Sequence, residues 1–118
     1  MQVKDAVGAY GERVAERHLA GQGLEVLARR WRCRWGEIDL VAVEDGCLVV
    51  CEVKTRRSTG TGEPAEAVTP VKLARLRRLA AAWLAQQDRS FAAVRIDVVA
   101  VVVPPRGAPV VEHLRAVA

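Results

Sequence analysis

GEIDLVAVEDGCLVVCEVK, residues 36–54, contains two runs of β-forming residues joined by a short acidic segment. The runs are Glu37–Val43 and Cys47–Lys54, and Asp45-Gly46 lies between them. An Asp-Gly pair between two such runs is a strong signal for a two-residue type I′ turn. We therefore predict an antiparallel hairpin centred on Asp45-Gly46.

The turn also predicts the register of this hairpin. Counting outward from Asp45-Gly46, Asp39 falls opposite Glu52 and Glu37 falls opposite Lys54. Opposed residues on one face of a sheet have Cβ atoms about 5 Å apart. Strand alternation predicts that these four charged side chains share one face. A slip of one residue would separate them.

Two opposed carboxylates repel each other, so the Asp39–Glu52 pair needs a physical reason. Mg²⁺ prefers oxygen ligands and is commonly held by one or two carboxylates with waters and phosphate oxygens. Lys54 beside such an ion could orient or deprotonate a water, which suits phosphodiester hydrolysis. The alternative to a metal site is a solvated sheet face on which Lys54 and an arginine neutralise the two carboxylates. We favour the functional site because four ionisable groups converge between apolar strands.

The flanking sequence predicts two helices. One is expected at Ala6–Ala20, with Gly21 and Gly23 able to stop it. The second begins at Thr69-Pro70, because Thr is a good N-cap and Pro suits the first helical position. It is expected to run to about Gln87, with an apolar stripe of Leu73, Leu76, Ala80, Trp83 and Leu84.

Further strands are expected on both sides of the hairpin. Leu24–Arg32 predicts a strand with Leu24, Val26 and Ala28 on one face, followed by a turn near Cys33-Arg34. Val94–Val103 is apolar on both faces, as in a central strand. The tail after Pro105 adds a short edge element. The order α-β-β-β-α-β predicts a single α/β domain over residues 1–118.

Composition restricts the class of protein. A chain of 118 residues with 51% hydrophobic residues can bury one core. Charges throughout the N-terminal residues and the lack of a long apolar run predict a cytoplasmic protein without a signal peptide or membrane partner. The three cysteines lack metal-ligand spacing and are expected to be small buried hydrophobes. A net charge of +4 is compatible with a polyanionic partner.

GEIDLVAVEDGCLVVCEVKTRR resembles the core of the PD-(D/E)xK nuclease superfamily. The whole chain resembles the YraN-like (UPF0102) family of bacterial proteins, which is similar to archaeal Holliday-junction resolvases. The resemblance also covers GAYGERVAERHLAGQGLEVLARRWRCRWGEIDLVA, CEVKTRRSTGTGEPAEAVTPVKLARLRRLAAAWL and VRIDVVAV. It implies a restriction-endonuclease-like core, in which helices flank a mixed central sheet.

The resemblance also implies roles for individual residues. Asp39 and Glu52 would be metal ligands for Mg²⁺ or Mn²⁺, with the backbone carbonyl of Val53 as a third. Lys54 would be the catalytic lysine. Glu12 in GAYGERVAE matches a first-helix glutamate that reaches the metal, although sequence alone favours a solvated helix residue.

Two further positions bear on this site. Glu37 is expected to support the site by pairing with Lys54, with metal ligation as the lesser option. Arg30 departs from the family pattern, where we expect an asparagine before Trp31-Arg32, and this departure concerns the local loop geometry.

Basic residues suggest where nucleic acid would bind. Arg56, Arg57, Lys72 and Arg75 are candidate phosphate contacts, which need only charge and position. Arg77 and Arg78 continue this series, or form an ordinary charged helix face.

Other motifs carry two interpretations each. RWRCRW could stack on bases through Trp31 and Trp35, but inward packing of the tryptophans is preferred. The polar loop Thr55–Val68 could order over a substrate. His18 and His113 are expected to be surface residues rather than general bases.

The sequence therefore predicts a metal-dependent endonuclease that acts on nucleic acid, with DNA, branched DNA included, as the expected substrate. A homodimer would suit symmetric cleavage of two strands. The alternatives are a non-catalytic nucleic-acid-binding or scaffold module that retains the nuclease fold, and a protein-interaction domain with no role in nucleic-acid binding.

Overall fold

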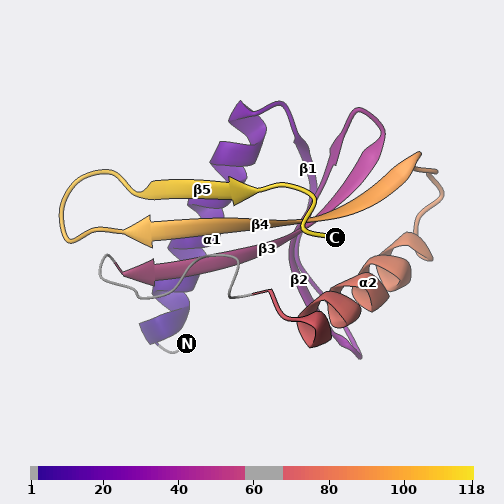
Figure 1. Ribbon diagram of the computed structural model, residues 1–118, viewed down its shortest axis with the longest axis horizontal. Coiled ribbons are helices and arrows are strands. Elements are labelled where there is room, and N and C mark those ends of the chain that lie inside the picture. The colour runs from indigo at the N-terminus through magenta and orange to yellow at the C-terminus, as the bar shows by residue number, and fades with distance from the viewer. Residues whose placement is uncertain (1–2, 58–67) are drawn as a thin grey trace.

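The computed structural model describes residues 3–57 and 68–118, which form a five-stranded sheet with a helix against each face (Figure 1). In chain order the elements are α1 (Val3–Gly21), β1 (Glu25–Cys33), β2 (Gly36–Glu44), β3 (Cys47–Arg57), α2 (Pro70–Leu84), β4 (Ala93–Val103) and β5 (Val110–Leu114). The strands lie in the order β1-β2-β3-β4-β5, and only β3 and β4 run parallel. The predicted α/β fold and α-β-β-β-α-β order are confirmed, and β5 is the predicted edge element.

The predicted hairpin forms between β2 and β3. Its ladder runs from Glu44 opposite Cys47 to Leu40 opposite Cys51, as counted from the turn. Asp45 and Gly46 have φ values of 51° and 79°, and a type I′ turn requires positive φ at both central positions. Local turn chemistry therefore determines this register.

Helix α2 is the crossover that a parallel strand pair requires. It begins as predicted, because the Thr69 side chain accepts a hydrogen bond from the Lys72 N–H and Pro70 is the first helical residue. It ends at Leu84, earlier than the predicted Gln87. Strand β3 continues to Arg57, and most of the predicted substrate-covering loop lies at 58–67, outside the described residues.

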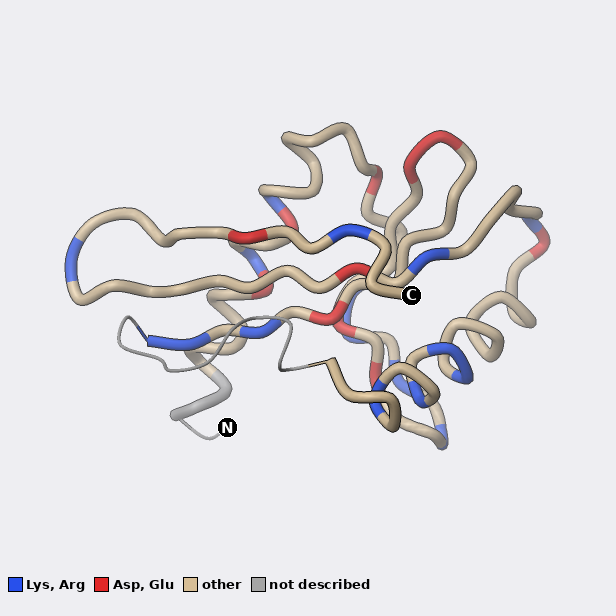
Figure 2. Tube along the Cα trace, viewed as in Figure 1, with Lys and Arg blue, Asp and Glu red and all other residues tan. Residues whose placement is uncertain are grey.

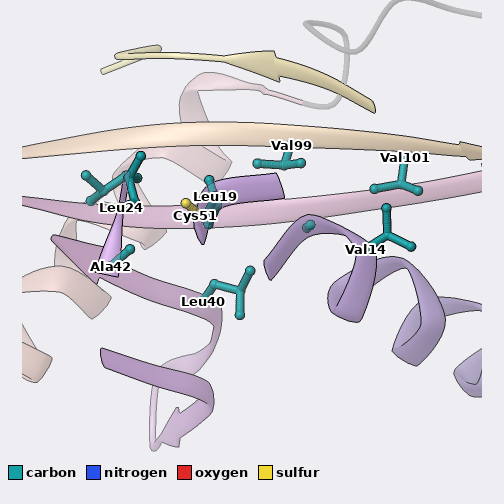
Figure 3. Close-up of a cluster of buried hydrophobic side chains, with 10 residues drawn as sticks. Val14, Leu19, Leu24, Leu40, Ala42, Cys51, Val99 and Val101 are labelled. Atoms are coloured by element: carbon teal, nitrogen blue, oxygen red, sulfur yellow. The ribbon is translucent and has the colours of Figure 1, made fainter. Parts of the chain in front are cut away.

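Two apolar clusters hold the helices to opposite faces of the sheet. Beneath α1, Val14 and Leu19 pack against Leu40, Cys51 and other strand residues (Figure 3). Beneath α2, the predicted helical stripe packs on the other face with Ile38, Val41, Leu48, Val50 and Ile96. None of the helices in the described residues is long and apolar enough to span a lipid bilayer.

Strand β1 is less regular than predicted. A β-bulge at Leu27 shifts its register against β2, so Val26 packs beneath α1 whereas Ala28 packs on the α2 side. The predicted shared face of Leu24, Val26 and Ala28 is therefore wrong, because a bulge reverses the alternation that follows it.

The turn after β1 also differs from the prediction. Arg34-Trp35 forms the turn, one residue later than expected, and Cys33 pairs with Gly36. Trp31 packs inward as expected. Trp35 does not pack inward as expected. It is 44% exposed, and the Arg34 guanidinium lies 5.1 Å from its ring centre.

Asp97 on β4 is a fully buried carboxylate that bonds to residues of β4, of β5 and of the segment after β5. Its oxygens accept hydrogen bonds from the Arg95 side chain at 3.0 and 3.2 Å and from the Ala116 N–H at 2.8 Å. His113 Nε2 lies 2.8 Å from the same carboxylate, and the ring of His113 meets the ring of His18 edge-on. The side chain of His113 is only 6% exposed, so the prediction of a surface histidine is wrong for this residue.

These contacts predict that Asp97 contributes strongly to stability. Burial alone would raise the pKa of Asp97, but hydrogen bonds from Arg95, the Ala116 N–H and His113 outweigh burial and hold the pKa below its ordinary value. Asp97→Ala should lower the free energy of unfolding by about 3 kcal/mol or more, because it leaves buried partners unpaired. Urea denaturation measures this loss, with Glu112→Ala on the exposed side of β5 as the control.

The pH dependence provides a second measurement of the same contribution. Because the folded pKa of Asp97 is lowered, its stabilisation is complete above the ordinary value of 3.8 and is lost as the pH falls through the folded pKa. The stability difference between wild type and Asp97→Asn should therefore narrow below about pH 4. A difference that stays constant to pH 2 would contradict this assignment.

Candidate active site

The β2–β3 ladder ends immediately before Asp39. Leu40 and Cys51 are its last paired residues, and the Asp39 carboxylate then accepts the Val53 N–H at 2.7 Å. The two strands therefore separate here, and a side chain takes the place of a backbone acceptor. The predicted backbone pairing of Asp39 with Glu52 does not form, although the predicted register leads up to it.

Strand β2 also changes orientation at this residue. Ile38 packs on the α2 side of the sheet and Leu40 packs on the α1 side. Residues two apart in a regular strand share a face, so the strand twists sharply around Asp39. The regular alternation from which all four charged side chains were predicted to share one face is therefore broken in β2. The change of face occurs at Asp39, between Ile38 and Leu40.

The electrostatic surroundings of Asp39 are strongly negative. Burial is the main reason that the pKa of this carboxyl is raised to about 7, and the Val53 N–H only partly opposes it. The negative charges of Glu52, Glu12 and Glu37 raise the pKa further. Carboxylates from α1, β2 and β3 thus come into one neighbourhood, which the hairpin register predicted for Asp39 and Glu52 and the family resemblance implied for Glu12.

Each of the three surrounding carboxylates has a cationic partner. The ion pairs are Glu12 with Arg30 at 2.7 Å, Glu52 with Lys72 at 2.5 Å, and Glu37 with Arg32 at 3.2 Å. The partner of Glu37 is therefore Arg32 rather than the predicted Lys54. The sequence did not indicate any of these pairs, because each joins residues from different elements.

The carboxylate oxygens near Asp39 suit a hard divalent cation, although they do not form a complete coordination site. Within residues 3–57 and 68–118, no three His, Cys, Asp or Glu side chains converge closely enough to hold a metal ion. Mg²⁺ needs only one or two carboxylates, because waters complete its coordination. Asp39 and Glu52 could supply these. Burial is the main cause of the raised pKa of Asp39 and the neighbouring carboxylates add to it, and a bound cation would favour the ionised form against both effects.

A groove of about 560 Å³ lies between α1 and the end of β3. Five of the predicted site residues line it: Glu12, Val53, Lys54, Arg56 and Arg57. Lys54 is exposed to solvent there. Glu52 lies toward α2, where it meets Lys72. Arg75 is exposed further along α2 near Gly36, so the predicted basic residues occupy two sides of Asp39.

Gly11 lets α1 approach β3 closely and was missed in the sequence. A Cβ at this position would lie 1.8 Å from the Thr55 hydroxyl oxygen, a distance that real contacts do not allow. The close approach positions the next residue, Glu12, at the groove. A glycine inside a helical pattern is the available signal, because it weakens a helix unless close packing requires it.

Arg30, the departure from the family pattern, has a φ of 47°. This left-handed region is unfavourable for most side chains but is tolerated by asparagine, which explains why asparagine suits the position. Arg30 accepts this backbone strain and donates to the Glu12 carboxylate.

The raised pKa of Asp39 predicts that its charge destabilises the fold. Its ionisation opposes folding above the ordinary value of 3.8 and does so fully above about 7. At pH 8 with a chelator, Asp39→Asn should therefore be more stable than wild type by about 1–3 kcal/mol. The difference should vanish toward pH 4. Chemical denaturation across this range tests it, with exposed Asp88→Asn as the matched control, and equal stabilities at pH 8 would contradict it.

Gly11→Ala should lower the free energy of unfolding by about 2 kcal/mol or more, because α1 must move away from Thr55. Gly8→Ala is a matched control in the same helix, where a Cβ would meet nothing within 4 Å. That variant should gain roughly 0.5–1 kcal/mol from helix propensity. Thermal denaturation followed by circular dichroism distinguishes the two, and similar effects from both variants would refute the close contact.

Comparison with known proteins identifies the family of this chain. The model of the family described as "Uncharacterised protein family UPF0102" matches residues 11–101, from the close contact on α1 into β4. A UPF0102 protein of Beutenbergia cavernae is 62% identical over 117 residues, which is 99% of both chains. Relatives from Kineococcus radiotolerans and Streptomyces griseus, also UPF0102 proteins, are 59% and 55% identical and cover 99% of this chain and 97% and 99% of their own lengths. With a matched family model and relatives of this similarity over nearly the full length, the chain belongs to the UPF0102 family.

Proposed function

We propose that this protein is a divalent-cation-dependent endonuclease that hydrolyses phosphodiester bonds in nucleic acid, with DNA, branched DNA included, as the first substrate to test. The observation that carries the proposal is Asp39, a partly buried carboxyl that accepts the Val53 N–H and has its pKa raised to about 7 among Glu12, Glu37 and Glu52. Strongly perturbed carboxyl groups beside a groove are typical of functional sites.

Asp39 and Glu52 would hold Mg²⁺ or Mn²⁺, with the Val53 carbonyl and Glu12 as further candidate ligands. A bound divalent cation supplies Lewis-acid activation of water and phosphate. The Val53 N–H fixes one oxygen of Asp39 at 2.7 Å, so the orientation of this carboxylate does not depend on the ligand. Glu12 and Glu52 would have to turn from Arg30 and Lys72 to join it.

Lys54 is the proposed catalytic lysine. It lines the groove with Glu12, and its exposed ammonium can hold a water or a phosphate oxygen by hydrogen bonding. Its position two residues beyond Glu52 on β3 keeps it beside the acidic residues. Its role would be to orient the attacking water and to stabilise charge that develops on the phosphate.

Basic residues support a nucleic-acid substrate. Lys and Arg segments lie along the end of β3 and along α2, on either side of acidic segments near the middle of the sheet (Figure 2). Arg56 and Arg57 line the groove itself. Trp35, exposed beneath Arg34, adds an aromatic surface suited to base stacking.

A second candidate is a nucleic-acid-binding module without catalysis. It is favoured by the ion pairs of Glu12 with Arg30 and Glu52 with Lys72, which neutralise two of the proposed ligands. With those two carboxylates neutralised, Lys54, Arg56 and Arg57 along the groove would leave a basic surface without requiring a metal ion. The two candidates differ in whether cleavage accompanies binding.

The test is cleavage of branched, duplex and single-stranded DNA, and of single-stranded RNA, with Mg²⁺ or Mn²⁺. Asp39→Asn, Glu52→Gln and Lys54→Met should each reduce the cleavage rate by about 100-fold or more, since the first two remove a proposed metal ligand and the third removes the proposed catalytic lysine. Asp88→Asn, exposed after α2, is the control.

The pattern across these variants distinguishes the candidates. Cleavage that survives all three substitutions would rule out this site. Salt-dependent binding without cleavage under either metal would instead establish the binding module.

A further inference from the structure

The ion pair between Glu52 and Lys72 differs from the other two pairs around Asp39. The side chains of Glu52 and Lys72 are 16% and 25% exposed, whereas those of Glu12 and Arg30 are 22% and 43% exposed. At 2.5 Å it is also the shortest of the three. Partial burial reduces screening by solvent, so solvent screens this pair less than the other two.

The backbone of Lys72 is fixed in the first turn of α2, whereas its charged group is at the end of a flexible side chain. Its N–H donates to the Thr69 hydroxyl at 3.1 Å in the first turn of α2, and Pro70 begins the helix. The side chain is a flexible four-carbon stem that carries a compact positive charge. Its ammonium can therefore change partners without any change in α2.

The Glu52 carboxylate would have two cationic partners, the Lys72 ammonium and the metal ion, if it also binds a divalent cation. An ion held by Asp39 and Glu52 would lie close to the Lys72 ammonium, since that group is 2.5 Å from a Glu52 oxygen. Like charges at such separations repel, and repulsion between a divalent ion and an ammonium is stronger than between two monovalent ions. The two cations therefore compete for one carboxylate.

We infer that Lys72 is a positioning residue that exchanges between the Glu52 carboxylate and a substrate phosphate. Binding of a divalent cation releases the ammonium from Glu52, and the released ammonium then binds the nucleic-acid backbone beside the metal. This inference rests on the proposed function, and it adds that metal and nucleic acid bind cooperatively through one side chain. Coupling of this kind must be reciprocal.

The first experiment is titration of the whole protein with Mn²⁺ by calorimetry, without nucleic acid. Lys72→Met removes the competing charge and should tighten Mn²⁺ binding by about threefold to tenfold. Lys72→Arg keeps the charge and should bind Mn²⁺ like wild type. Arg77→Met removes one charge from an exposed position further along α2 and should leave Mn²⁺ binding unchanged.

The second experiment measures binding of a fluorescent DNA duplex by anisotropy in a chelator. Glu52→Gln removes the carboxylate that holds Lys72 and should tighten DNA binding about threefold, as metal binding would. The same substitution in a Lys72→Met background should give no such gain, because no ammonium is released. Circular dichroism of each variant establishes that it is folded.

These results separate the inference from the proposed function. A tighter Mn²⁺ affinity for Lys72→Met, together with loss of the Glu52→Gln gain in the double variant, supports the exchange even if no substrate is cleaved. An unchanged or weaker Mn²⁺ affinity for Lys72→Met overturns it, even if cleavage by wild type is strong. Equal tightening by Arg77→Met also overturns it, because the effect would then be general to the helix charge.

Discussion

The hydrogen bond from the Val53 N–H to the Asp39 carboxylate is the contact on which the geometry of this site depends. It forms where the β2–β3 ladder stops, after Leu40 and Cys51. A backbone donor of a central strand must find an acceptor when its neighbour leaves. Because a carboxylate fills that need, the strands can separate without an unsatisfied amide, and the opening between them contains a charged group.

The two helices approach this opening from opposite faces of the sheet. Helix α1 lies close to β3 because Gly11 has no side chain to meet Thr55, and this brings Glu12 toward Asp39. Helix α2 begins beside the other face and brings Lys72 to Glu52. A parallel pair with a helical crossover makes this arrangement possible, since α2 must return across the sheet between β3 and β4.

The charges at this opening oppose the stability of the fold. Asp39 is partly buried near three other carboxylates, each of which has its own arginine or lysine partner. Asp97 on β4, opposite Cys51 of β3, has hydrogen-bonding partners in Arg95, His113 and the Ala116 N–H. This contrast between the two aspartates supports a structural role for Asp97 and is consistent with the role proposed for Asp39.

The sequence alone determined the parts of the structure that follow from local chemistry. Asp45-Gly46 predicted the hairpin and its register as far as Leu40 and Cys51, because a type I′ turn imposes both. Thr69-Pro70 predicted the start of α2, and alternating apolar residues predicted the strands. The register also led to Glu37 and Glu52 near Asp39, whereas Glu12 was indicated only by the family resemblance.

Only the tertiary structure decided where regular patterns stop and which charges meet. The separation of the strands at Asp39 and the bulge at Leu27 reverse the alternation from which faces are predicted. The partners of Glu12, Glu37 and Glu52 depend on which helix or strand lies opposite. The physical reason is the same throughout: turn and helix signals act over a few residues, whereas ion pairs, close helix contacts and buried hydrogen bonds join residues that only folding brings together.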